Sequence, residues 1–213
     1  MVREQIAGRG IRDARVLAAM AATPRERFVD AEHAGEAYQD SPLAIAAGQT
    51  ISQPYIVALM AEALELGPSD RVLEVGAGSG YAAAVLGAIV SEVYAVERHA
   101  ELAQLAAQRL VELGMQHVHV RCGDGTLGWP EHAPYDAIVV SAGGPRLPPP
   151  LMEQLAIEGR LVMPVGDTPR EQELVRARRL GPDHCEQESL GAVKFVPLVG
   201  AAGWPGTPPR GAW

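Results

Sequence analysis

The chain has 213 residues, of which 47% are hydrophobic, so it can bury one substantial core and is too short for a second full domain. Its formal net charge of −8 and its pI near 5.2 exclude broad electrostatic capture of nucleic acid or of an anionic membrane, which depends on clustered Lys and Arg. The sequence shows no bilayer-length apolar run and no secretory leader, which predicts a cytoplasmic protein.

The N-terminal part of the chain is predicted to be helical and then irregular. Apolar residues recur at helical spacing over residues 2–22, and Asp13 can cap a second helix within that stretch. Residues 30–52 carry mixed signals, and we expect mostly loop with one short helix. Pro54 lies in the first turn of an apolar helix, for which Ser52 is the expected N-cap.

Beyond this helix the pattern alternates regularly between strands and helices. Strands are predicted over residues 71–75, 92–97, 117–122 and 135–142, with helices over 81–90 and 99–114. Strands rich in Val and Ile that alternate with helices predict an α/β fold with a doubly wound, mostly parallel sheet. Residues 147–166 then predict a short helix and a strand, and residues 172–199 predict a hairpin of antiparallel strands.

A glycine-rich loop follows the first of these strands. Gly76, Gly78 and Gly80 stand at alternate positions in the run EVGAGSGY, where a strand would lead into a helix. Glycines let backbone N–H groups approach a bound cofactor closely. The dinucleotide fingerprint G-x-G-x-x-G would place a glycine at the position of Tyr81, so the G-x-G-x-G form fits methyltransferases that use S-adenosylmethionine better. A nicotinamide-dependent dehydrogenase remains the alternative from another enzyme class.

Two acidic residues are expected at the same edge of the sheet as this loop. Glu97 ends the second strand, 21 positions beyond Gly76, where a carboxylate can accept hydrogen bonds from both ribose hydroxyls. Asp124, in the GDG run after the third strand, could accept a hydrogen bond from an adenine amino group. A solvated strand-end acid and a turn acid are the structural alternatives. The Cys and His residues show no metal-ligand spacing, so no metal is expected.

Several segments together resemble the protein-L-isoaspartate O-methyltransferase family. These are PRERFVD, AYQDSPLAIAAGQTISQPYIVALM, VLEVGAGSGYAAAVL, GDGTLGWPEHAPYDAIVVSA, GRLVMPVG and VKFVPLVG. The resemblance covers about residues 2–204, and GQTISQP is its most discriminating part because many methyltransferases share the glycine loop. It implies a class I, Rossmann-like methyltransferase core with an N-terminal helical extension, C-terminal antiparallel strands, and S-adenosylmethionine as cofactor.

The resemblance also implies a set of site residues. Those expected to bind the cofactor are Thr50, Ile51, Ser52, Gly76, Gly78, Ser79, Gly80, Glu97, Arg98, Asp124 and Gly125. Those expected to contact the isoaspartyl peptide are Thr50, Ile51, Val196, Pro197 and Leu198, the last three from a strand that would hold the peptide backbone. Ser52 is the candidate catalytic residue.

The sequence divides the chain into regions with different expected roles. A single methyltransferase domain is expected over residues 1–200, followed by a flexible tail rich in Gly and Pro over residues 201–213. Within the domain we expect a helical and substrate-loop region over 1–66, a cofactor-binding core over 67–166 and C-terminal strands over 167–200.

The chemistry that the family carries out needs orientation more than acid–base catalysis. The free α-carboxylate of an isoaspartyl residue is ionised at neutral pH, since its reference pKa is roughly 3.5, so no general base is required. The site must align carboxylate oxygen, methyl carbon and sulfur. Ser52 could donate its hydroxyl to the carboxylate, and the helix N-terminus beside it would favour the negative charge. A plain N-cap role for Ser52 stays open.

The resemblance implies repair of damaged proteins. The methyl ester would close to a succinimide, whose hydrolysis returns part of the pool to normal Asp. The expected partners are isoaspartyl proteins and peptides, which a monomer with an open cleft would bind in extended form. Two alternatives stay open: a specialised relative that methylates one Asp of a dedicated peptide, and a non-catalytic cofactor-binding module.

Overall fold

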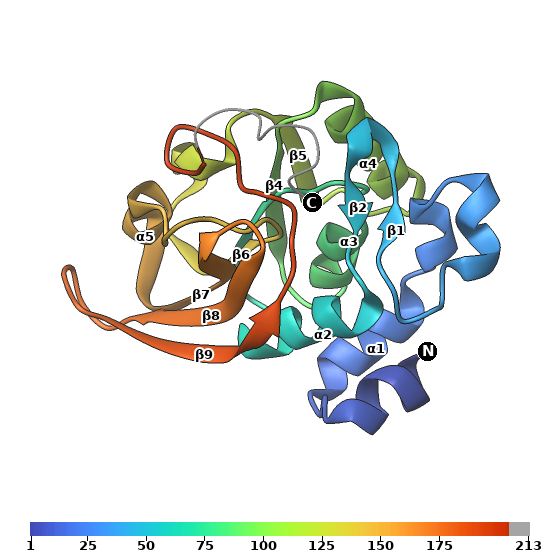
Figure 1. Ribbon diagram of the computed structural model, residues 1–213, viewed down its shortest axis with the longest axis horizontal. Coiled ribbons are helices and arrows are strands. Elements are labelled where there is room, and N and C mark those ends of the chain that lie inside the picture. The colour runs from blue at the N-terminus through green and yellow to red at the C-terminus, as the bar shows by residue number, and fades with distance from the viewer. Residues whose placement is uncertain (205–213) are drawn as a thin grey trace.

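A seven-stranded sheet forms the centre of the protein in the computed structural model, which describes residues 1–204 (Figure 1). The strands are β3 (Arg71–Val75), β4 (Glu92–Glu97), β5 (Val118–Cys122), β6 (Tyr135–Val140), β7 (Leu155–Thr168), β8 (Glu171–Arg179) and β9 (Cys185–Val193). Their spatial order is β5-β4-β3-β6-β7-β8-β9, in which β5 to β7 are parallel and β8 and β9 are added antiparallel. The predicted doubly wound, mostly parallel sheet with C-terminal antiparallel strands is confirmed.

Two apolar cores cover the two faces of the sheet. Successive side chains of a strand point to opposite faces, so Val72 joins one core and its neighbour Leu73 the other. The first core includes α1 (Ala14–Ala22), α2 (Pro54–Ala63), α3 (Tyr81–Gly87) and α4 (Ala100–Glu112). The second lies under α5 (Pro149–Gln154). Burial on both faces explains the Val- and Ile-rich strands.

The N-terminal extension is helical, as predicted, and begins with the short helices η1 (Val2–Ile6) and η2 (Ala7–Arg9). The Asp13 carboxylate caps α1 by accepting hydrogen bonds from the N–H groups of Arg15 and Val16, at 2.8 and 3.2 Å. This cap confirms the predicted start of the second helix.

The segment between α1 and α2 contains more structure than the loop with one short helix that its sequence predicts. It holds η3 (Arg25–Phe28), η4 (Ala31–Glu36), β1 (Leu43–Ala44), η5 (Ala46–Gly48) and β2 (Thr50–Ile51). The antiparallel pairing of β1 with β2 was missed because two-residue strands show no periodicity. The pairing places Ile45 within 3.5 Å of a Cβ built on Gly78, which brings this segment against the glycine loop.

The N-terminus of α2 differs from the prediction in its cap. Gln53, not Ser52, is the N-cap residue, and its side chain does not bond to the helix. The carboxylate of Asp40, remote in sequence, caps the helix instead. Its Oδ1 accepts a hydrogen bond from the N–H of Tyr55 at 3.0 Å. The Ser52 N-cap prediction is therefore wrong. The helix N-terminus was expected to favour a substrate carboxylate, and one of its N–H groups, that of Tyr55, is bonded to Asp40, a contact that local sequence cannot reveal.

The chain leaves the sheet at Val193, earlier than the hairpin predicted to extend to residue 199. The segment that follows pairs with the loop after β6, where Gly143 donates to the carbonyl of Val196 and accepts from the N–H of Leu198, both at 2.8 Å. Trp204 Nε1 also donates to Gly143 O at 2.9 Å. Residues 205–213 of the predicted tail lie outside the described residues. Among residues 1–204, no helix combines the length and apolarity needed to cross a membrane.

Candidate active site

The glycine loop connects β3 to α3 through three left-handed backbone positions. Gly76, Gly78 and Gly80 have φ values of 88°, 53° and 89°, which residues with a Cβ rarely adopt. Gly80 also packs against α4, where a Cβ would lie 3.1 Å from that of Ala106. The turn itself therefore requires all three glycines.

The N–H groups of the three loop glycines make hydrogen bonds inside the protein. Gly76 donates to Val96 O at 2.8 Å, Gly78 to Glu97 Oε2 at 2.9 Å and Gly80 to Ala77 O at 2.8 Å. These three N–H groups therefore already have acceptors within the protein, and their expected place beside a cofactor stays a prediction. The glycines contribute the tight turn, and the missing Cβ atoms let a ligand approach the backbone closely.

Glu97 lies at the end of β4 with only 4% of its surface exposed. Its Oε2 accepts from Gly78, and its Oε1 accepts from the N–H of His99 at 2.9 Å. A carboxylate offers about four acceptor positions, so roughly two remain for the hydroxyls of a ligand. Glu97 lines a hollow, here called the rim pocket, that it shares with Arg98, Gly125 and the segment 196–199.

Asp124 is engaged within the protein. Its Oδ1 accepts from the N–H and the hydroxyl of Thr126, at 2.9 and 2.7 Å, and its Oδ2 accepts from the N–H of Ala201 at 2.7 Å. Burial works against the ionised form, but the hydrogen bonds from Ala201 and Thr126 outweigh it and lower the pKa of Asp124. The neighbouring Gly125 lines the rim pocket, where a Cβ would lie 2.5 Å from Val75 Cγ1.

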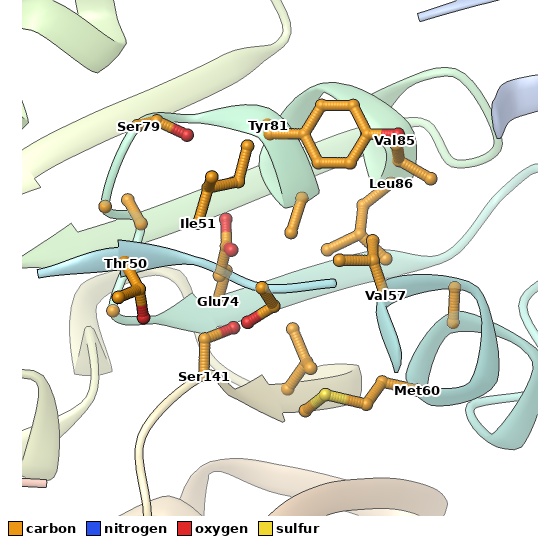
Figure 2. A pocket seen from close by; sticks show the side chains of 17 residues that line it. Thr50, Ile51, Val57, Met60, Glu74, Ser79, Tyr81, Val85, Leu86 and Ser141 are labelled. Carbon is orange, nitrogen blue, oxygen red and sulfur yellow. The ribbon is translucent and has the colours of Figure 1, made fainter. Parts of the chain in front are cut away.

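A second hollow, here called the inner pocket, lies between β2, α2 and α3 (Figure 2). It is mostly apolar, with Ile51, Val57 and Met60 among the residues that line it, and it contains the carboxyl group of Glu74 from the middle of β3. Figure 2 shows this carboxyl group directed into the pocket toward Ile51.

The Glu74 side chain has no exposed surface and neither of its oxygens has a hydrogen-bond partner among the described residues. Burial, with a smaller contribution from the charge of Glu97, raises the pKa of Glu74 well above its ordinary value. A buried acid without a partner costs free energy. Such a group inside a pocket makes the inner pocket a candidate binding site.

A third hollow, here called the groove, has a volume of about 620 Å³ and lies between α2 and the end of β9. Thr50 and Ser141 line the groove, the inner pocket and the rim pocket, so the three hollows meet at these two residues. Ser52 lines the groove and the inner pocket. None of these three hydroxyl groups donates or accepts a hydrogen bond within residues 1–204. Three free hydroxyls therefore surround the junction.

Arg25 is a buried residue that bonds to the backbone of Ser52. It is fully buried, its Nε donates to Ala37 O and its Nη2 donates to Ser52 O, both at 2.8 Å. Its guanidinium carbon lies 4.6 Å from the centre of the Tyr81 ring, a cation–π geometry. Burial lowers the pKa of Arg25, yet a guanidinium stays charged at any physiological pH. Arg25 thus ties Ser52, the residue directly after β2, to α3.

Most of the residues proposed from the sequence come together around the three hollows. Those that line at least one hollow are Thr50, Ile51, Ser52, Gly76, Gly78, Ser79, Glu97, Arg98, Gly125, Val196, Pro197 and Leu198. Gly80 and Asp124 line none of the three. Pro197 and Leu198 line the rim pocket, and only Val196 of that segment also lines the groove.

Sequence reasoning missed Glu74, Ser141 and Arg25. Glu74 is an acid within the apolar run RVLEV, an exception that could have drawn attention to it. Ser141 follows β6 directly, at the edge where parallel sheets bind ligands, so topology could have suggested it. No local sequence pattern indicated the role of Arg25, because its hydrogen-bond partners lie 12 and 27 residues away.

A family model describing protein-L-isoaspartate(D-aspartate) O-methyltransferases matches residues 1–203. The chain belongs to this family. A protein-L-isoaspartate O-methyltransferase of Pelobacter propionicus is 63% identical over 204 residues, which cover 96% of this chain and 91% of the relative. One of Rhodopseudomonas palustris is 60% identical over 211 residues, which cover 99% of this chain and 97% of the relative.

Solved structures of isoaspartate O-methyltransferases share the architecture of this family member. One is 29% identical with a TM-score of 0.86, over 95% of this chain and 67% of its own. A second, from Plasmodium falciparum, was determined in complex with S-adenosyl-L-homocysteine. It is 24% identical with a TM-score of 0.78, over 93% of this chain and 96% of its own, and bears on the fold alone. The predicted class I methyltransferase fold is confirmed.

Proposed function

We propose that the three hollows perform the family's reaction: methyl transfer from S-adenosylmethionine to the free α-carboxylate of L-isoaspartyl residues. The observation that carries this assignment is the junction at Thr50 and Ser141, where two small pockets meet a larger groove. A donor held in the pockets would meet an acceptor held in the groove at this point. The adjacent backbone amide nitrogen of the resulting ester can attack the ester carbonyl and expel methanol, which closes a succinimide that hydrolysis returns in part to Asp.

The residues around the two pockets fit S-adenosylmethionine. Glu97 would accept hydrogen bonds from the ribose hydroxyls, since roughly two acceptor positions of its carboxylate remain free. Glu74 would lie near the positively charged methionyl end, where a buried carboxylate gains the partner that it lacks in the protein alone. When bound, S-adenosylmethionine supplies an electrophilic methyl group on a sulfonium.

The acceptor carboxylate needs to be held rather than activated. It is ionised at neutral pH, so no side chain has to remove a proton. Ser52, Thr50 and Ser141 offer hydroxyl donors at the junction that could orient one carboxylate oxygen toward the methyl group. The N-terminus of α2 does not contribute its Tyr55 N–H, which is bonded to Asp40. Catalysis would therefore come from proximity and orientation.

The groove is the proposed site of the peptide. Its volume of about 620 Å³, larger than that of either pocket, suits a chain bound in extended form, with Val196 near the acceptor residue. We expect the protein to act as a cytoplasmic monomer on many isoaspartyl proteins and peptides, without a nucleic-acid partner. A dedicated peptide partner would instead require side-chain recognition along the groove.

Matched peptides test this function directly. Two peptides that differ only by isoaspartate or normal aspartate at one position are incubated with the protein and methyl-labelled S-adenosylmethionine. Label should enter only the isoaspartyl peptide and should leave as methanol after mild base treatment, which identifies an ester. Equal labelling of both peptides, or none of either, would contradict the proposal. Labelling of several unrelated isoaspartyl sequences separates broad repair from a single dedicated partner.

A further inference from the structure

The charge of the groove is opposite to that of the protein. The chain as a whole carries 26 acidic and 18 basic residues. Among the described residues that line the groove, the charged ones are Arg9 and Lys194, both cationic, and none is acidic. A hollow of opposite sign on an acidic protein selects ligands by charge.

The two cations differ in whether their charges are paired with other groups of the protein. Arg9 donates from Nη1 to Asp40 Oδ2 at 2.6 Å, and its guanidinium carbon lies 3.5 Å from the centre of the Tyr55 ring. Its charge is therefore paired within the protein. Lys194 is exposed and makes no hydrogen bond or ion pair with another described residue. It is also the only lysine in the sequence.

Lys194 lies close along the chain to the proposed acceptor position. It stands two residues before Val196, which lines both the groove and the rim pocket. Two residues of chain span at most roughly 7 Å, so the lysine lies beside the path of a peptide whose isoaspartate is at the junction. Figure 1 shows the end of β9, just before Lys194, beside α2, which forms the opposite wall.

We propose that Lys194 makes the enzyme favour isoaspartyl peptides that carry an acidic side chain within two residues of the isoaspartate. This inference rests on the proposed function, because it places the peptide in the groove. The ammonium group would pair with the Asp or Glu carboxylate of the substrate. An exposed ion pair of this kind changes affinity by up to about fivefold, an effect that salt weakens.

Peptide pairs that differ only by Glu or Gln, two residues before or after the isoaspartate, test this preference. At low salt, the wild-type protein should show a KM up to about fivefold lower for Glu at one or both of these positions. The KM ratio should approach one in Lys194→Met, persist in Lys194→Arg, and shrink as salt is added. Arg27→Met serves as the matched control because it removes one exposed positive charge outside the groove. Its ratio should equal that of the wild type.

A labelling experiment separates this inference from the reaction itself. An amine-reactive acylating reagent can modify only Lys194 and the N-terminal amine. Mass spectrometry therefore measures the extent of acylation at Lys194 directly. The Glu peptide should protect Lys194 from acylation more than the Gln peptide does, whether or not methyl transfer follows. Equal KM values at both positions, a preference unchanged in Lys194→Met, or equal protection would overturn the inference. Protection without methyl transfer would support it and contradict the proposed reaction instead.

Discussion

Arg25 donates a hydrogen bond from Nη2 to the carbonyl oxygen of Ser52 at 2.8 Å, across 27 residues of sequence. The same guanidinium donates from Nε to Ala37 O, so one buried side chain holds two loop segments at once. The position of the Ser52 hydroxyl at the junction therefore depends on a residue that lines none of the three hollows.

Replacement of Arg25 by Met should lower both stability and activity. The carbonyls of Ala37 and Ser52 would lose their donor, and a buried carbonyl without a partner costs about 1–3 kcal/mol. We expect urea unfolding to show a loss in that range and methyl transfer at saturating cofactor to fall further than the folded fraction. Arg27→Met, two residues away on an exposed pair with Glu112, should change neither. Equal behaviour of the two variants would contradict a positioning role for Arg25.

Ser52→Ala should slow methyl transfer without destabilising the protein. Ser52 does not cap α2, so the free energy of unfolding should change by less than about 0.5 kcal/mol. A hydrogen bond to a charged group is worth about 1.5–3 kcal/mol, so kcat/KM should fall roughly tenfold to a hundredfold. Ser69→Ala, at an exposed turn, is the control. A stability loss of about 1 kcal/mol would restore the N-cap interpretation, and equal losses of turnover and cofactor affinity would argue against orientation.

Glu74 should make stability depend on pH. Its pKa is raised in the folded protein above the ordinary value of 4.5, so the folded state keeps a proton that the unfolded state has lost. The free energy of unfolding should therefore fall as pH rises between these two pKa values, by at most about 1.4 kcal/mol per pH unit. Urea unfolding of wild type and Glu74→Gln at several pH values measures this slope, which the variant should lose. A slope that the variant keeps belongs to other groups.

Binding of S-adenosylmethionine should release a proton from the same residue. A cationic group placed beside Glu74 favours its ionised form, so binding and deprotonation should be coupled. Calorimetric titrations in two buffers with different ionisation enthalpies measure the number of protons released. The release should disappear in Glu74→Gln. An identical heat in both buffers for the wild-type protein would show that Glu74 does not face the charged end of the cofactor.

Asp124→Asn tests whether this residue binds adenine or only the chain itself. The expected acceptor role predicts a Kd for S-adenosylhomocysteine at least about tenfold higher in the variant. The variant also weakens the bond to Ala201, so a control must loosen the same turn while it keeps the carboxylate. Thr126→Ala loosens this turn and keeps the Asp124 carboxylate, because the Thr126 hydroxyl donates to Asp124 and accepts from the N–H of Ala202. Equal Kd values in both variants would leave Asp124 a structural role alone.

The order of the elements and the edge that binds ligands could be predicted from the sequence. Strand and helix periods are local properties, and the glycines at 76, 78 and 80 mark backbone positions with positive φ. Glu97 could be placed because the end of a parallel strand, identified from its pattern, must lie at that same edge. These inferences need only neighbours along the chain and the rules of parallel sheets.

Only the tertiary structure decided which groups meet. Asp40 takes the capping role that local rules assign to Ser52, and Asp124 is bonded to Ala201, 77 residues further on. The burial of Glu74 in a pocket and the free charge of Lys194 beside the groove are likewise products of packing. Contacts between residues far apart in sequence depend on how the elements pack, and no local pattern of residues encodes them.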